Sequence, residues 1–377
     1  MPTRVDRSRD LDQVSLLIGG KVHSSWSRYD IDSDLLIPAD AWQVELGLPR
    51  GEFPPTVAPG ERVEVRVGAD PVMTGRIDEI AHRVGKDAHT LSISGRDGAA
   101  VLVDCSAPIF TAKQATLAEI VANVARPLGV TRIRIDADAA AAREKVNVQP
   151  GESAWDTIVH AAEANGLWPW FEPDGTLVIG GPDYSKAPVA SLVMRRSGQG
   201  NNLVSLDLAQ SMAERYSDFT VLGQGHGTSV EAGRHALRAA VKDAELSNRG
   251  IYRPRIVVDY DADNTGIARS RARKLLSDSR LRGLTLTATV RGHRTSDGQL
   301  WQPGQRIHVL SEPHGLDGIY FLMARKFTGG RGLGSTSRLV LKEDGVWVLD
   351  AHPHKRAKKR ARGRTKKGEE LEIIDVG

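Results

Sequence analysis

Two short stretches of this chain carry almost the same residues although they lie 244 positions apart. Residues 59–65 read PGERVEV and residues 303–309 read PGQRIHV. In each, Pro-Gly predicts a turn, and the following residues alternate between apolar and polar as a half-buried strand requires. The shared positions are Pro59, Gly60, Arg62, Val63 and Val65, and then Pro303, Gly304, Arg306, Ile307 and Val309. A whole domain fits between the two stretches.

The likeness continues in the same order along both regions. The first stretch is followed by Gly75-Arg76-Ile77 and later by Asp97-Gly98, the second by Gly318-Ile319-Tyr320 and by Asp344-Gly345. The separation grows only from 244 to 247 positions, which small changes in loop length explain. We therefore interpret the two regions as copies of one β domain. Chance similarity is the alternative, because Pro-Gly before a strand is common.

Helical spacing sets the middle of the chain apart from these β-rich regions. Thr116 with Glu119 fits a capping box, and Ser153 with Asp156 repeats the device; each pattern precedes an apolar stripe. A hairpin is expected after the second helix, around the Asp174-Gly175 turn. Two more helices are expected later in the chain, over residues 230–246 and 266–282.

The expected fold is mainly β with an α+β insertion. Two duplicated domains, each a β-barrel or β-sandwich, would flank small α+β domains. Length supports more than one domain, since 377 residues exceed the usual size of one. The expected boundaries are 1–106 for the first β domain, 107–184 for the inserted α+β part, 185–350 for the second β domain with its helices, and 351–377 for a basic tail.

The positive charge of the chain is concentrated at its C-terminal end. The net charge is +4, yet residues 355–377 alone hold nine Lys or Arg against four Asp or Glu. The body of the chain is therefore close to neutral. A basic protein invites a nucleic-acid hypothesis, but here only the tail has the required bias.

Cysteine use and hydropathy exclude other classes of protein. Cys105 is the only cysteine, so the chain can form neither an internal disulfide nor a cysteine-based metal site. No segment approaches the ~20 apolar residues of a membrane span, and no signal peptide is expected. The histidines and carboxylates show no metal-binding or catalytic spacing, so we expect no catalytic residue, cofactor or metal.

Residues 149–156, QPGESAWD, resemble the start of a glycan-binding LysM module. On that interpretation this stretch would contact peptidoglycan. The alternative is structural: Ser153 caps a helix and Trp155 is buried beneath it. We favour the structural interpretation and keep a peptidoglycan-binding or cell-wall-degrading tail protein as the alternative function.

The basic tail has three competing interpretations: a solvated charge run, a salt-sensitive contact with DNA or an acidic protein, or a spacer before an alternating segment that adds to the sheet edge of a partner. We prefer a spacer with a partner contact. The candidate contact residues are Lys355, Arg356, Lys358, Lys359, Arg360, Arg362, Arg364, Leu371, Ile373 and Ile374.

Over roughly residues 10–350 the chain resembles the baseplate hub proteins of contractile-tailed bacteriophages, in particular the Mu-like hub. It is more distantly similar to the T4 hub protein, the late-control D proteins and the hub half of type VI spike proteins. The motifs that carry the resemblance are VQPGESAWD at 148–156, NGL at 165–167, DGTLVI at 174–179 and LWQPGQ at 300–305.

The resemblance implies a non-enzymatic structural hub in the virion, assembled in the host cytoplasm. It implies a homotrimer whose two tube-like β domains form a pseudo-sixfold ring that joins the sixfold tail tube to the threefold spike. Expected partners are the tail tube protein and the spike protein, with the tape-measure protein and other baseplate proteins as further candidates. DNA would be met only in transit.

Overall fold

The computed structural model divides the chain into two compact units. The first unit comprises Met1–Ala161, Pro169–Leu208 and Leu286–Asp344, and the second comprises Ala162–Trp168, Ala209–Thr285 and Gly345–Gly377. The structure describes residues 11–24, 26–47, 57–86, 89–109, 111–112, 116–136, 146–147, 151–163, 167–224, 236–259 and 265–347.

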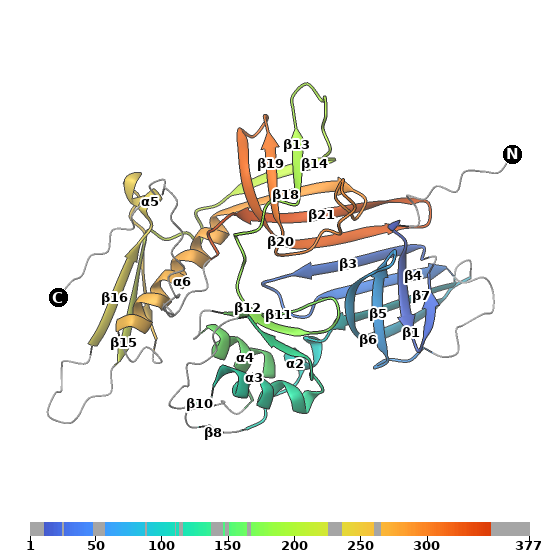
Figure 1. Ribbon diagram of the computed structural model, residues 1–377, viewed down its shortest axis with the longest axis horizontal. Coiled ribbons are helices and arrows are strands. Elements are labelled where there is room, and N and C mark those ends of the chain that lie inside the picture. The colour runs from blue at the N-terminus through green and yellow to red at the C-terminus, as the bar shows by residue number, and fades with distance from the viewer. Residues whose placement is uncertain are drawn as a thin grey trace, which may run out of the picture. The chain divides into compact units, whose positions relative to one another are not determined.

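One 13-stranded sheet dominates the first unit (Figure 1). Its strand order is β14-β18-β21-β20-β3-β4-β7-β6-β5-β1-β2, with β19 paired to β20 and β13 paired to β19. The strands are β1 (Val14–Ile18), β2 (Lys21–His23), β3 (Arg28–Asp34), β4 (Ala41–Gly47), β5 (Arg62–Val67), β6 (Asp70–Val84), β7 (His89–Asp97), β13 (Ala190–Met194), β14 (Ser205–Gln210), β18 (Leu284–Arg291), β19 (Arg306–Ser311), β20 (Leu316–Gly330) and β21 (Leu333–Glu343).

This sheet contains the same strand pattern twice. Strands β3 to β7, here the N-terminal set, are ordered β3-β4-β7-β6-β5; the C-terminal set is ordered β14-β18-β21-β20-β19. Corresponding pairs also share their register. The pair Gly75↔Asp97 corresponds to Tyr320↔Glu343, so the strands match two residues away from the sequence match of Gly75 with Gly318. Two pairs further on both ladders shift register, between Ile77 and Glu79 and between Leu322 and Ala324. A β-bulge is a specific local feature of a strand pair, so bulges at matching positions show that the two strand sets agree in detail.

The repeated Pro-Gly turns are held by the same hydrogen bond in both sets. The amide of Gly60 donates to the carbonyl of Ile77 at 2.7 Å, and the amide of Gly304 donates to that of Leu322 at 2.8 Å. Both glycines have left-handed backbone angles, with φ of +88° and +91°. Glycine adopts this conformation without steric cost, which explains why the sequence keeps it in both turns.

Alternation of apolar residues accounts for the strands that follow these turns. In β5 the side chains of Val63, Val65 and Val67 are buried, whereas Arg62 is exposed. In β19 the side chains of Ile307 and Val309 are fully buried. Because successive residues point to opposite faces, this pattern fixes which face of each strand enters the core.

A small α+β part lies between the two strand sets along the chain, mostly within the first unit. It contains α2 (Ala100–Asp104), β8 (Thr111–Ala112), α3 (Leu117–Ala125), β9 (Ile133–Ile135), β10 (Val146–Asn147), α4 (Ala154–Glu163), β11 (Trp168–Phe171) and β12 (Leu177–Gly180). The capping box of Thr116 and Glu119 is present, and Ser153 Oγ accepts from the amide of Asp156 at 3.0 Å. Both predicted helix starts are confirmed.

The second unit contains a three-stranded sheet covered by a helix. Its elements are β15 (Asp218–Gln224), β16 (Ala236–Lys242), α5 (Ala244–Asn248), β17 (Pro254–Val258) and α6 (Thr265–Gly283). Ala268 and Ala272 of α6 pack with Val221 of β15 and Ala239 of β16. Small residues on the helix let it approach the sheet closely. The helix predicted over 266–282 is confirmed.

The helix predicted over 230–246 is wrong. Within the described residues this range holds strand β16, whose pairing with β15 runs from Lys242 to Ala236, and the start of α5 at Ala244. The alanine-rich sequence favours a helix locally, but its ladder with β15 and its place under α6 decide the outcome. Asp243 caps α5 by accepting from the amide of Glu245 at 3.0 Å.

The expectation of a mainly β protein with α+β elements is confirmed. The sequence did not indicate, however, that both strand sets belong to one sheet. They meet where β20 pairs with β3 (Figure 1, orange-red beside blue). The range expected as a second β domain, 185–350, also contributes residues to both compact units.

Candidate assembly interface

The strand sets join through an antiparallel ladder between β3 and β20, called the internal junction below. Its pairs run from Ala324↔Asp34 to Gly329↔Tyr29. On the opposite side of β20, β21 pairs with it from Tyr320 to Gly330. On the junction side, β19 pairs with Leu316 to Phe321, and β3 occupies the half of β20 that β19 leaves open. Each set thus gains a neighbour for a strand that would otherwise be an edge.

Arg325 is buried at this junction with only 4% of its surface exposed. Its Nη1 donates to the carbonyl of Ile31 at 3.2 Å, and its guanidinium lies 4.1 Å from the ring centroid of Phe327. Burial lowers the pKa of Arg325 to about 10, while the nearby carboxylates of Asp40 and Asp32 oppose that shift. The buried cation therefore depends on negative charge from the N-terminal set.

A chain of hydrogen bonds crosses the junction at His293, which is fully buried. Tyr29 Oη lies 2.7 Å from His293 Nε2, and Ser337 Oγ lies 3.0 Å from His293 Nδ1. Ser337 donates its own proton to the carbonyl of Gly292 at 2.6 Å, so its oxygen must accept from Nδ1–H. Nε2 is then the acceptor for the hydroxyl of Tyr29.

The same burial fixes the charge state of these groups. Desolvation, with a contribution from the nearby Arg325 cation, lowers the pKa of His293 to about 3. Burial also raises the pKa of Tyr29, and Asp12 adds to that shift. Both side chains are therefore neutral near pH 7, which is what a buried hydroxyl–imidazole chain requires.

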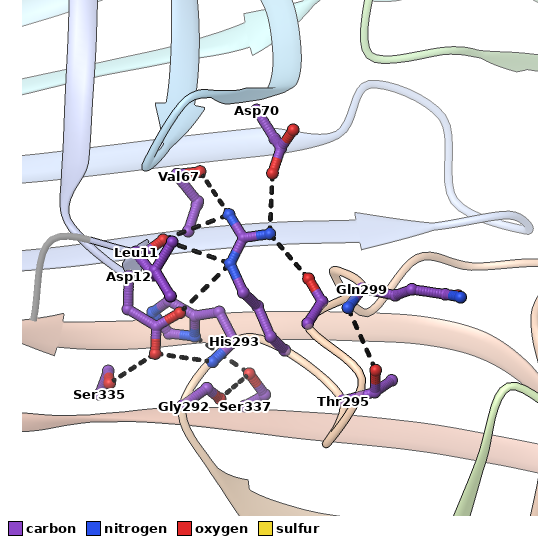
Figure 2. A network of polar contacts seen from close by, with 12 residues as sticks. Leu11, Asp12, Val67, Asp70, Gly292, His293, Thr295, Gln299, Ser335 and Ser337 are labelled. Carbon is purple, nitrogen blue, oxygen red and sulfur yellow. Dashed lines mark hydrogen bonds and ion pairs between the residues drawn. The ribbon is translucent and has the colours of Figure 1, made fainter. Parts of the chain in front are cut away.

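Arg294 links the two strand sets through backbone carbonyls and carboxylates. Its Nη2 donates to the carbonyls of Val67 at 2.9 Å and Leu11 at 3.2 Å, and its Nη1 lies 2.8 Å from Asp70 Oδ2. Asp12 Oδ2 accepts from the amide of His293 at 3.1 Å. Figure 2 shows Asp12 joined to both Ser335 and His293, with Asp70 at the opposite end of this network.

Two further carboxyl groups of the N-terminal set, those of Asp40 and Asp97, interact with each other, and Asp40 also interacts with Arg325. Burial raises the pKa of Asp40 to about 6, although the amide of Asp34 donates to its Oδ1 at 2.9 Å. Burial, and then repulsion from Asp40, raises the pKa of Asp97 as well. Both carboxyl groups line a small pocket of the first unit, together with Trp155, Trp170 and Phe171.

The residues predicted from the repeat lie in β5 and β19 or in the turns just before them, and neither strand takes part in the internal junction. Arg306 forms a bidentate ion pair with Asp344, at 3.0 and 2.6 Å, and so ties β19 to the end of β21. The predicted tail residues, from Lys355 to Ile374, lie outside the described residues. Trp155 is 6% exposed, as the helix-cap interpretation predicts.

Sequence reasoning missed the residues that build the internal junction. Tyr29, His293, Arg294 and Arg325 are single polar residues within strands or turns, and their partners are far away in the chain. Arg325 gave one usable signal, because it interrupts an apolar run in β20. A buried charge is rare without a partner, so such an interruption points to an interface.

In the part of the chain that the structure describes, no group of three His, Cys, Asp or Glu side chains is placed to hold a metal ion. No helix among those residues is long and apolar enough to cross a membrane.

Family models of phage tail proteins match four consecutive parts of the chain. They are the N-terminal domain of the Mu phage baseplate assembly protein GpP-like family at 13–97, the second domain of the baseplate hub protein gp44-like family at 99–181, the third domain of the tail protein NMB1110-like family at 215–276, and a tail protein C-terminal domain at 278–346. Each model therefore describes a protein of the phage tail.

Whole-chain comparisons agree with these models. A tail protein from Neisseria meningitidis MC58 is 42% identical, with a TM-score of 0.79 over 90% of this chain and 99% of that one. The baseplate hub protein gp44 of Escherichia phage Mu is 26% identical over 323 residues, 83% of this chain and 82% of gp44. A 43 kDa tail protein of prophage MuSo2 from Shewanella oneidensis shares the fold, at 24% identity and a TM-score of 0.78 over 89% and 99% of the two chains.

The matching family models and relatives thus define a phage tail protein, and its main sheet contains two matching strand sets. The chain belongs to the family of Mu-like baseplate hub proteins. It is accordingly a component of the phage tail baseplate, and the resemblance inferred from its sequence is confirmed.

Proposed function

We propose that this hub protein is a homotrimer that adapts the sixfold tail tube to the threefold spike. Each chain supplies two tube-like strand sets, so three chains present six similar surfaces around one axis. One face of such a ring matches a sixfold partner, while the chain itself repeats only three times. The proposed partners are the tail tube protein and the spike protein, with the tape-measure protein and other baseplate proteins nearby.

The shared register of the two strand sets carries this proposal. Equal strand order alone would leave the two sets free to differ in shape. The common bulge after Ile77 and Leu322 and the common turn hydrogen bonds at Gly60 and Gly304 give them the same local geometry. Two surfaces must be this similar before one kind of partner subunit can dock on both.

The proposed role is mechanical and needs no catalysis or cofactor. The ring would hold the spike until the sheath contracts, then move with tube and spike, and DNA would pass it only in transit. Incubating the protein with purified peptidoglycan tests the enzymatic alternative. The hub role predicts that no soluble fragments are released, and steady release would contradict it.

Mass in solution tests the trimer directly. Light scattering or native mass spectrometry on the full chain should give three times the mass of one chain. A stable monomer, both alone and with tail tube and spike proteins added, would contradict the proposal.

A further inference from the structure

The internal junction has an unfilled counterpart within the same chain. Half of β20 pairs with β19 and its other half with β3, whereas β6, the counterpart of β20, pairs with β5 only from Asp70 to Arg76. From Glu79 to Val84, β6 has β7 on one side and no described strand on the other. β14, the counterpart of β3, is likewise the last described strand at the other end of the sheet.

The matching segments of β20 and β6 differ in burial, and a missing neighbouring strand beside β6 explains the difference. In β20 the junction residues Ala324, Arg325 and Phe327 are between 0% and 9% exposed. In β6 the corresponding residues are exposed or half-buried, and Val84 is 60% exposed. A long edge strand with an exposed apolar residue is a site where another strand adds.

The two strand sets also define which residues would face one another. Ile77 corresponds to Leu322 at the shared bulge, which aligns β6 with β20. The amide of Ser27 donates to the carbonyl of Glu45 at 2.7 Å, and the amide of Val204 donates to the carbonyl of Thr289 at 2.8 Å. These matching hydrogen bonds lie just before β3 and just before β14, so they align the two strands. Each residue pair of the internal junction can be replaced by the matching residues of β6 and β14. Four of the resulting facing pairs are used below: Glu79 opposite Ser211, Ala81 opposite Ala209, Arg83 opposite Asp207, and Val84 opposite Leu206.

We propose that β6 of one chain pairs antiparallel with β14 of a second copy in this register. The proposal rests on the trimer proposed above and specifies its contact. Repeated around the ring, it would extend one sheet through all three chains, from β14 to β6 of one chain and on to β14 of the next. A path of strands closed in this way has no open end, while β2 and β13 remain the last described strands of its side branches.

Charge at the transferred positions is complementary. Asp30, in β3, forms a 2.8 Å ion pair with Lys326 across the internal junction. Its counterpart in β14 is Asp207, also acidic and exposed. Lys326 is replaced by Ala81, but Arg83 stands directly opposite Asp207 in the transferred register. Opposite charges on facing strand positions stabilise a pair, and like charges weaken it.

Side-chain size is complementary as well. At the end of the internal junction Tyr29 lies opposite Gly329, where a Cβ atom would come within 2.4 Å of the tyrosine hydroxyl. In the transferred pair the smaller Leu206 replaces the tyrosine and Val84 replaces the glycine. Tyr29 and Gly329 fill the space in the internal junction, and the two aliphatic residues Leu206 and Val84 would fill the matching space between two chains.

A disulfide between facing positions tests the register. In a Cys105→Ser chain, the pair Ala81→Cys and Ala209→Cys should oxidise to covalent species of up to three chains on a non-reducing gel, because facing Cα atoms lie within disulfide range. The control pair Ala81→Cys and Ser205→Cys is four residues out of register and should stay uncrosslinked. A trimer by mass that forms no Ala81–Ala209 disulfide overturns this pairing but leaves the adaptor role intact. A monomer overturns both.

Charge reversal provides an independent test at exposed positions. Asp207→Arg or Arg83→Asp should each weaken trimer formation by about tenfold, and the double variant should recover most of the loss. Circular dichroism should show the monomer fold unchanged in all three. Unchanged association in both single variants, or a double variant no better than either, would contradict the Arg83–Asp207 contact.

Discussion

His293 shows how a single residue holds two distant parts of this chain together. It is fully buried, receives a hydrogen bond from Tyr29 and donates one to Ser337. Protonation would place an unpaired charge in the core and convert its acceptor nitrogen into a donor. Near pH 7 the neutral ring therefore fits its site, and its contribution to stability depends on pH.

Acid should weaken the wild-type protein through His293. Its pKa is about 3 in the folded protein, below the value of ~6.5 expected in the unfolded chain. The unfolded state binds the extra proton as pH falls below that value, so this contribution is present above it and is lost towards pH 3. Between pH 7.5 and pH 5 the loss should be about 2 kcal/mol.

Denaturant unfolding of His293→Asn at the two pH values checks this prediction. The stability difference between wild type and variant should narrow by that amount at pH 5. Ser337→Ala is the matched control, because it removes a hydrogen bond of the ring but leaves the histidine buried. Its stability should be lower at both pH values, with the pH dependence of the wild type. Equal pH dependence in His293→Asn and wild type would contradict the argument.

At the scale of elements, the two Pro-Gly turns start matching strands in the same way. Gly60 and Gly304 have positive φ, and nothing lies within 4 Å of a Cβ atom placed on either. A substitution there is therefore opposed by the backbone conformation alone and not by a clash. Equivalent turns should consequently respond equally to the same change.

Gly60→Ala and Gly304→Ala should each lower the free energy of unfolding by about 1 kcal/mol. Gly334→Ala is the control, since Gly334 also has open space around it but lacks a positive φ. Thermal unfolding of the three variants should show similar losses in the first two and little change in the third. A clear difference between Gly60→Ala and Gly304→Ala would argue against equivalent turns.

At the scale of the whole molecule, charge and assembly reside in different segments. The body of the chain is close to neutral, and the basic surplus lies after residue 354. The surfaces proposed for assembly belong to β6 and β14, within the described strands. Oligomerisation and any attraction to DNA or acidic proteins should therefore be separable.

Deleting residues 352–377 should leave the trimer intact and remove DNA affinity at low salt. Electrostatic binding needs clustered cations, and residues 355–377 hold nine Lys or Arg against four Asp or Glu, whereas the rest of the chain is close to neutral overall. Mass measurement and a salt titration of DNA binding on full and truncated chains check both parts. DNA binding that persists after truncation, with steep salt dependence, would favour a nucleic-acid role for the body.

The sequence by itself determined the local structure and the repetition. Alternating valines in β5, the capping box at Thr116 and the paired Pro-Gly turns follow from short-range patterning, because strand faces, helix starts and turns depend on neighbouring residues. The helix expected over 230–246 failed where a strand partner overrode helical preference. Only the tertiary structure decided that β20 lies beside β3, since that pairing joins residues almost three hundred positions apart. The residues that secure it, Arg325 and His293, have partners that no local pattern can indicate.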